Sequence, residues 1–399
     1  MPRLWKFDPH CLCNLAYAYA IVTPDNDNNN EKSQPPNVKV EDDGTIIIET
    51  SIPTLLKDDE DDDTTIKTIL FHHIAKKSIQ KLKQFNSQDV SNMVWSFAKA
   101  GVLHPRLFES VGHLDNLRGF TSQGLSNTVW AYARTSISHP ILFERVASEV
   151  IVRQPDFNSQ EVANLLWAFA CTGQLDIDLF TCLESKVIRL LDQCNAQEIA
   201  NIAWSYAVAN VAAPSLFNND FIHACIKKED EFTNENLSQL HQWQLWQREL
   251  DKSDAVTLPS SLQEKCYNAF VSAKPTASRL QEDVTFVLAS LGLEPQSEVL
   301  TKSGYRLDAV VRVDKSKKLI YIEVDGPFHF LIDGSSETRT FPAGSTILKH
   351  RQVRSLNEEE EDGTYTSALV SIPYWHWYAM NDIGKKQQYL CSLLGLFIK

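Results

Sequence analysis

One short phrase recurs along this 399-residue chain and constrains its fold more than any other feature. Strong copies begin at Phe85, Phe120, Phe157 and Cys194, and weaker copies begin at Phe7 and Phe232. Each strong copy has an Asn seven residues after its first residue and a Trp three residues later: Asn92, Asn127, Asn164 and Asn201, then Trp95, Trp130, Trp167 and Trp204. The Asn positions are 35, 37 and 37 residues apart. This period is typical of stacked supersecondary units and predicts an α-solenoid of helical hairpins.

The pattern inside each copy indicates how its first helix begins and which side it buries. Asn158 is a candidate N-cap with Glu161 at its N3 position, and Asn86 with Asp89 and Asn195 with Glu198 repeat this arrangement. The apolar residues of the second copy follow helical spacing: Val90, Met93, Val94, Phe97 and Ala98. Gly101 and Gly173 are expected to end first helices. Proline is expected to open the second helices, at Pro105, Pro140 and Pro214.

A polar column lies opposite the apolar side of the first helix. With Val90 at 0°, residues Asn92, Ser96 and Lys99 fall at about 200°, 240° and 180° on a helical projection. The Asn column can form a ladder of hydrogen bonds between repeats, or a row of RNA readers, because an amide both donates and accepts. Identical residues cannot read different bases in different repeats, so we favour the ladder. The Trp column recurs with the apolar stripe, so we interpret it as core rather than as a stacking platform. The candidate RNA-binding residues are Asn92, Asn127, Asn164, Asn201, Ser96, Lys99 and Arg134.

The distribution of charge along the chain argues against non-specific binding of duplex nucleic acid. The formal net charge is −13, but two acidic stretches, 25–63 and 358–362, together carry −15, which leaves +2 on the rest of the chain. The array from Ile66 to Leu250 has sixteen Lys/Arg and eighteen Asp/Glu, so it lacks the basic surplus of a duplex-binding protein. Single-strand binding by polar and stacking contacts stays possible. No apolar run reaches the roughly 20 residues of a membrane helix, and the scattered Cys imply no disulfide framework.

Composition divides the chain into segments. We expect a degenerate first repeat at 1–22, a disordered acidic insertion at 23–65 and the repeat array at 66–250. A linker and a helix at 251–273 then precede a small α/β domain at 274–399, in the order α, β, β, α, β, α. No targeting peptide is visible ahead of the first copy, and we expect the natural N-terminus to be incomplete here.

Two strands of the C-terminal domain carry a candidate metal site. If residues 314–317 form the loop between Tyr305–Val313 and Lys318–Asp325, Asp308 faces Glu323, and Asp325 lies on the same face. Such carboxylates suit Mg²⁺ or Mn²⁺ as catalytic ligands. His329 follows, where it can act as acid or base. The alternative is that these carboxylates simply form ion pairs with nearby cations, namely Arg306, Lys318 or Arg351.

These segments resemble known families. Residues 319–330 (LIYIEVDGPFHF) and 370–377 (VSIPYWHW) are similar to the signature of the RAP domain. The repeats resemble octotricopeptide-type units of organellar RAP proteins and the FAST-kinase-like family. The RAP domain is itself similar to the restriction-endonuclease-like fold, whose metal site uses an Asp and then Glu-x-Lys. Asp308 and Glu323 match that pattern, but Asp325 replaces the Lys, which removes a charge that stabilises the transition state.

The resemblance implies an organellar RNA-binding protein that acts in RNA processing, stability or translation. Its expected partner is single-stranded mRNA or rRNA in the mitochondrial matrix or chloroplast stroma, within a ribonucleoprotein complex and away from membranes. One alternative is a metal-dependent RNA endonuclease that uses Asp308, Glu323 and Asp325, with His329. Another is a protein-binding helical scaffold, which the near-neutral charge of the array allows.

Overall fold

The computed structural model describes residues 8–22, 37–40, 46–49, 60–114, 117–153, 156–250, 256–272, 277–313, 318–336, 338–357 and 368–395. Two compact units are present: unit 1 comprises residues 1–190 and 331–341, and unit 2 comprises residues 191–330 and 342–399. Most of the predicted insertion at 23–65 lies outside the described residues, as do 314–317 and 358–367. None of the described helices is both long and apolar enough to cross a membrane.

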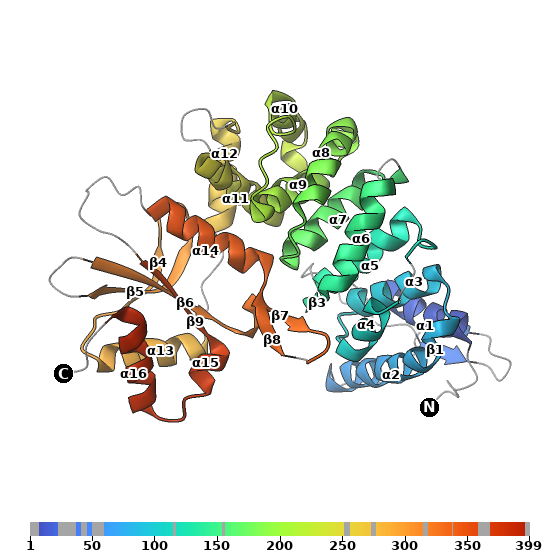
Figure 1. Ribbon diagram of the computed structural model, residues 1–399, viewed down its shortest axis with the longest axis horizontal. Helices are drawn as coiled ribbons and strands as arrows, with labels where there is room; N and C mark the ends of the chain where they lie inside the picture. Colours follow the sequence, from blue (N-terminus) through green and yellow to red (C-terminus); the bar gives the residue numbers. More distant parts are fainter. Residues whose placement is uncertain are drawn as a thin grey trace. The chain divides into compact units, whose positions relative to one another are not determined.

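Unit 1 is built mainly from helical hairpins (Figure 1). Its helices are α1 (Pro9–Val22), α2 (Glu60–Lys81), α3 (Ser87–Lys99), α4 (Pro105–Gly112), α5 (Ser122–Arg134), α6 (Pro140–Arg153), α7 (Ser159–Cys171) and α8 (Ile177–Leu190), with the 3₁₀ turn η2 (Leu82–Gln84). Its strands are β1 (Asn37–Val40), β2 (Ile46–Glu49), β3 (Ile137–Ser138) and, from later in the chain, most of β7 (Phe330–Asp333) and β8 (Arg339–Pro342). β1 and β2 pair antiparallel inside the predicted insertion, and β7 pairs parallel with β3.

The helix boundaries follow the predicted capping chemistry. Asn86, Asn158 and Asn195 each form a reciprocal capping box with the acidic residue three positions later. Gly101 has a φ of 65°, the left-handed conformation that ends a helix. Pro105 and Pro140 open α4 and α6 as expected. The prediction for Pro214 is wrong, because the next second helix begins at Asn219, after the N-cap Asn218.

The first helices pack side by side: α1 against α3, α3 against α5 and α5 against α7 within unit 1. This explains why two sequence-based assignments are wrong. Ser96 is fully buried, and its hydroxyl donates to the carbonyl of Asn92, so it cannot reach a ligand. The Trp column is not uniformly core, because Trp95, Trp130 and Trp167 are only half-buried and Trp204 alone is buried. A solenoid helix has neighbours on two sides, which a single apolar stripe does not capture.

Unit 2 combines the last repeats with an α/β region. Its helices are α9 (Ala196–Ala209), α10 (Asn219–Lys227), α11 (Asn234–Leu250), α12 (Ser260–Val271), α13 (Arg279–Ser290), α14 (Gly344–Asn357), α15 (Tyr374–Tyr378) and α16 (Ile383–Leu394), with the 3₁₀ turns η4 (Leu191–Gln193), η5 (Glu229–Glu231) and η6 (Pro327–His329). Its sheet has the order β4–β5–β6–β9, formed by Gln296–Leu300, Arg306–Val313, Lys318–Asp325 and Ala368–Pro373. The first two pairings are antiparallel, and β6 pairs parallel with β9.

The sheet is covered on both faces, as Figure 1 shows. One core joins Val287 of α13 and Leu390 of α16 to Val311 and Ile322 of the sheet. The other joins Leu245 of α11 and Val353 of α14 to Tyr321. The predicted small α/β region is therefore present. Its predicted element order omitted β4, β7, β8 and α15, which are short.

Arg351 of α14 holds the C-terminal end of α9. Its guanidinium donates to the carbonyls of Ala207 and Val208, at 3.1 Å for Val208, and its Nε lies 3.2 Å from Glu249 Oε2. Cations stabilise the free carbonyls at helix C-termini. Arg351 was one of the cations expected to pair with the strand carboxylates, but its contacts lie with the last repeats instead.

We therefore expect Arg351→Ala to lower the unfolding free energy by about 1.5–3 kcal/mol, the range for hydrogen bonds to charged groups. Thermal unfolding measures this loss. Arg354→Ala is the matched control, because Arg354 is exposed on the same helix. Equal melting temperatures for the two variants would contradict a role for Arg351 in stability.

Candidate functional site

An open groove of about 510 Å³ crosses the first helices of unit 1. Its walls come from α1, α3, α5 and α7, so consecutive repeats supply equivalent positions. The Asn column lines it with Asn92, Asn127 and Asn164. The prediction that these Asn side chains share one continuous surface is confirmed for the three repeats of unit 1.

A second amide column lines the same groove and was missed from the sequence. Gln88, Gln123 and Gln160 each stand four residues before the Asn of their repeat, at the second residue of the helix, and all three are exposed. Residues four apart lie on the same side of a helix. The signal was present in the sequence, because the same Gln recurs in every strong copy, including Gln197.

The ladder and reader hypotheses are separated by hydrogen bonding. Asn201 is buried and accepts a hydrogen bond from Gln239 Nε2 at 3.0 Å, so it forms one step of a ladder within unit 2. The side-chain amides of Asn92, Asn127 and Asn164 have no hydrogen-bond partner among the described residues. They are half-buried and line the groove. The expected ladder is therefore correct for Asn201 and wrong for these three.

Aromatic side chains stand beside the amides. Trp95 and Tyr17 line the groove, with ring centroids 5.4 Å apart. Tyr17 occupies the Trp position of the first, weaker copy. Partly exposed aromatic rings can stack on bases. The predicted cations differ in exposure, since Lys99 is half-buried at the end of α3 and Arg134 is exposed at the end of α5.

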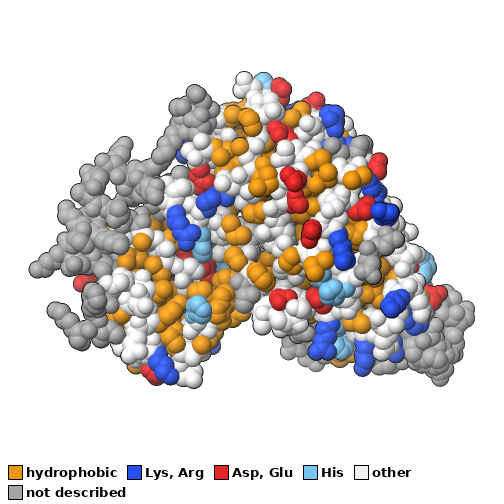
Figure 2. Space-filling view, viewed as in Figure 1, with side chains coloured by type: hydrophobic (Ala, Val, Ile, Leu, Met, Phe, Trp, Pro, Cys, Tyr) orange, Lys and Arg blue, Asp and Glu red, His pale blue; other side chains and the backbone are white. Residues whose placement is uncertain are grey.

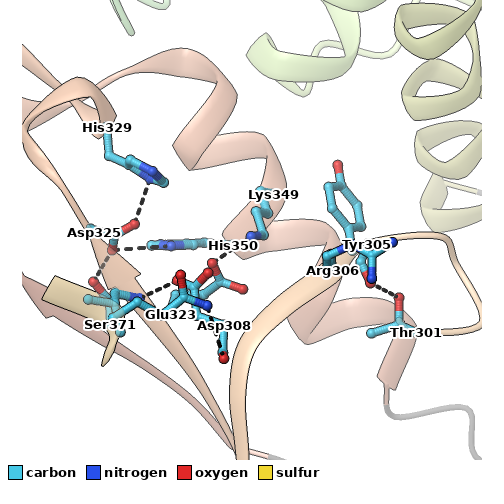
Figure 3. A network of polar contacts seen from close by, with 12 residues as sticks. Thr301, Tyr305, Arg306, Asp308, Glu323, Asp325, His329, Lys349, His350 and Ser371 are labelled. Carbon is cyan, nitrogen blue, oxygen red and sulfur yellow. Dashed lines mark hydrogen bonds and ion pairs between the residues drawn. The ribbon is translucent and has the colours of Figure 1, made fainter. Parts of the chain in front are cut away.

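The carboxylate cluster lies in unit 2, at the end of β6 (Figure 3). The β5–β6 register runs from Ala309 opposite Ile322 to Val313 opposite Lys318, as predicted. Asp308 lies one position further along, and its Oδ2 accepts a hydrogen bond of 2.7 Å from the backbone of Val324. Glu323 and Asp325 have no exposed surface.

Lys349 and two imidazole rings surround this cluster. Lys349 Nζ of α14 lies 2.5 Å from Glu323 Oε2. His329 Nδ1 and His350 Nε2 lie 2.9 and 3.4 Å from the two oxygens of Asp325. The sequence placed His329 near these carboxylates without naming its partner, whereas Lys349 and His350 were missed. In the Glu-x-Lys pattern, a Lys follows the Glu on the same strand. Here Asp325 stands at that position, and Lys349 of α14 brings a positive charge to Glu323 instead.

Burial sets the protonation of these carboxyls. Burial raises the pKa of Glu323 to about 8; Lys349 opposes the rise, and the nearby carboxylate of Asp308 adds to it. Burial also raises the pKa of Asp308, against its backbone hydrogen bond. For Asp325, burial acts in the same direction, but the contacts with His329, His350 and Ser371 outweigh it and hold its pKa below the ordinary value.

These contacts do not fit a Mg²⁺ or Mn²⁺ ion held by Asp308, Glu323 and Asp325. A divalent cation needs several carboxylate oxygens directed at one point. Here Lys349 lies beside Glu323, and two imidazole rings lie beside Asp325. The carboxylate oxygens of Asp308, Glu323 and Asp325 do not gather within 4.8 Å among the described residues. The arrangement is a buried polar cluster held by contacts within the protein.

Glu109, His113 and His139 of unit 1 do bring ligand atoms within 4.8 Å of one another. However, His139 Nδ1 accepts a hydrogen bond from Leu142 N at the start of α6, and burial lowers the pKa of this ring. A neutral ring that accepts through Nδ1 carries its proton on Nε2, which faces Glu109 at 3.7 Å. This tautomer is unsuited to binding a metal through Nε2, so the cluster serves the fold.

Comparison with known families locates a similarity in the repeats. Residues 64–214 match a family described as RNA-editing substrate-binding complex 6 protein. The matched span includes α3, α5 and α7, and with them both amide columns of the groove. It does not reach the sheet of unit 2. No curated protein matches the chain.

An Asn→Ala substitution should change stability differently at a buried ladder position and at a groove position. Asn201→Ala leaves the buried Gln239 amide without its acceptor, so we expect a loss of about 1–3 kcal/mol in unfolding free energy. Asn164→Ala removes a side chain without a partner and should leave the melting temperature nearly unchanged. Thermal unfolding of both variants measures this. A similar loss for both would show that Asn164 has a structural partner.

The raised pKa of Glu323 predicts a pH dependence. Because its pKa rises from an ordinary value of 4.5 to about 8 on folding, its stabilising contribution is complete below 4.5 and is lost as pH rises through about 8. Glu323→Gln removes this titration. We expect the melting temperature of the variant, relative to the parent, to increase between pH 5 and pH 9. Parallel pH profiles would contradict the assignment.

Proposed function

We propose that this chain binds single-stranded RNA along the groove of unit 1 and acts in RNA processing within a ribonucleoprotein complex. The observation that carries the proposal is the row of amides on Asn92, Asn127 and Asn164, which face a polar groove without a protein partner. A half-buried amide that the protein leaves unsatisfied is suited to hydrogen-bonding a ligand. Trp95 and Tyr17 add stacking surface beside them.

The family similarity supports the same proposal independently. The matched family is named for a substrate-binding complex in RNA editing, and the match covers the repeats that form the groove. The organellar setting is a finer proposal, consistent with the resemblance to organellar RAP proteins. We also propose that 66–250 is an octotricopeptide-like array and that 274–399 is a RAP domain, which offers the RNA a second contact.

Charge supports recognition by polar groups rather than by phosphate pairing. On the face in Figure 2, basic and acidic side chains of the described residues are interspersed. Within the groove, the carboxylate of Glu161 is engaged by the backbone of Asn158 in a capping box. The other side chains that line the groove, and that a ligand would contact, are mainly uncharged. RNA binding should therefore depend less on salt than phosphate-dominated binding does.

Binding is better supported than cleavage. A metal-dependent hydrolytic site must admit both substrate and a metal ion, whereas Glu323 and Asp325 are fully buried and already contacted by Lys349 and His329. Metal-dependent cleavage by the purified chain that Glu323→Gln abolishes would restore the endonuclease alternative. The scaffold alternative requires that no RNA binds above background.

We expect the triple variant Asn92→Ala, Asn127→Ala and Asn164→Ala to bind its preferred single-stranded RNA at least about tenfold more weakly, because three hydrogen bonds are lost. Fluorescence anisotropy measures the affinity, and thermal unfolding checks the fold. Asn219→Ala is the control, since Asn219 is exposed outside the groove.

For the parent, the slope of log K against log salt should be far shallower than the value of about −7 that roughly ten phosphate contacts would give. A steep slope with unchanged affinity in the triple variant would contradict the proposal.

A further inference from the structure

The two amide columns form a repeated pair. Each of three consecutive repeats presents one exposed Gln and, four residues later, one half-buried Asn: Gln88 with Asn92, Gln123 with Asn127, and Gln160 with Asn164. Every pair occupies the same turn of its helix, because each Gln is the second residue of α3, α5 or α7. The same chemical reader is therefore offered at each step along the groove.

The residues between the pairs do not offer a competing charged reader. At the position after the Gln, Asp89 and Glu161 accept backbone hydrogen bonds within their capping boxes, and Gly124 has no side chain. Cation readers favour guanine, and carboxylate readers favour cytosine. The groove presents amides to its ligand instead.

An amide places a donor beside an acceptor. This pattern matches the edge of adenine, where N6–H donates and N7 accepts, and Asn or Gln forms bidentate contacts there. In helical-repeat proteins that read RNA, each repeat can take one base through two or three side chains. Identical readers cannot specify a varied sequence, but they do specify the same base at each step.

We propose that the groove selects a run of adenines in single-stranded RNA, one adenine for each repeat, read by the paired Gln and Asn side chains. The inference rests on the proposed RNA-binding function and adds the base identity. Tyr17 and Trp95 stack on a base at the end of the run formed by α1 and α3.

The first test compares oligonucleotides of one length in fluorescence anisotropy at constant salt: oligo(A), oligo(U), oligo(C) and a mixed sequence. We expect oligo(A) to bind at least about tenfold more tightly than the others, since each bidentate contact discriminates between bases. Tighter binding of another oligonucleotide, or equal binding of all four, overturns this inference while leaving RNA binding intact. Absence of binding to any RNA overturns the proposed function itself.

The second test changes the reader in the middle repeat. Gln123→Arg converts an adenine reader into a guanine reader. The variant should prefer oligo(A) interrupted by one guanine over uninterrupted oligo(A), by about tenfold, whereas the parent shows the reverse preference.

Gln84→Arg is the matched control for the second test, because it adds the same charge at an exposed Gln outside the groove. It should keep the preference of the parent. An unchanged preference in Gln123→Arg, or an equal change in Gln84→Arg, overturns the assignment of Gln123 as a reader.

Discussion

Close packing of consecutive first helices is the constraint on which the groove depends. Ser96 of α3 and its equivalents Ala131 and Ala168 are fully buried, and their small size allows each first helix to approach the next. The polar positions beside them are consequently brought into rows. The groove is therefore a product of stacking, and each of its columns has the period of the repeat.

The same stacking has a different result in unit 2. There α9 packs against α11, and the loop before β5 covers α11: His241 contacts the carbonyl of Ser303, and Gln242 Nε2 donates to the hydroxyl of Tyr305. Trp204 becomes buried and donates to Gln242. A column that lines a groove in unit 1 thus becomes part of the interior where further chain covers it. Asn201 is paired because Gln239 of α11, at the Asn position of the last copy, donates to it.

In the carboxylate cluster, burial and charge compensation act together. Removing Glu323 and Asp325 from water is costly unless cations or hydrogen bonds accompany them. Lys349 and His350 provide this compensation from α14, the helix whose Arg351 also holds α9. α14 therefore links the sheet to the last repeats within unit 2. The strand pair β5–β6 and its carboxylates form a buried polar centre of this unit.

The sequence by itself determined the local and periodic features. The capping boxes at Asn86, Asn158 and Asn195, the glycine stop at Gly101 and the β5–β6 register follow from interactions between near neighbours or from period-two alternation, so they were predictable. Tertiary structure alone decided which Asn are paired, which Trp is buried, and that Lys349 reaches Glu323 across 26 positions of sequence. The reason is physical. A hydrogen bond or an ion pair depends on which atoms from distant segments arrive nearby, and helical or strand periodicity carries no information about that arrival.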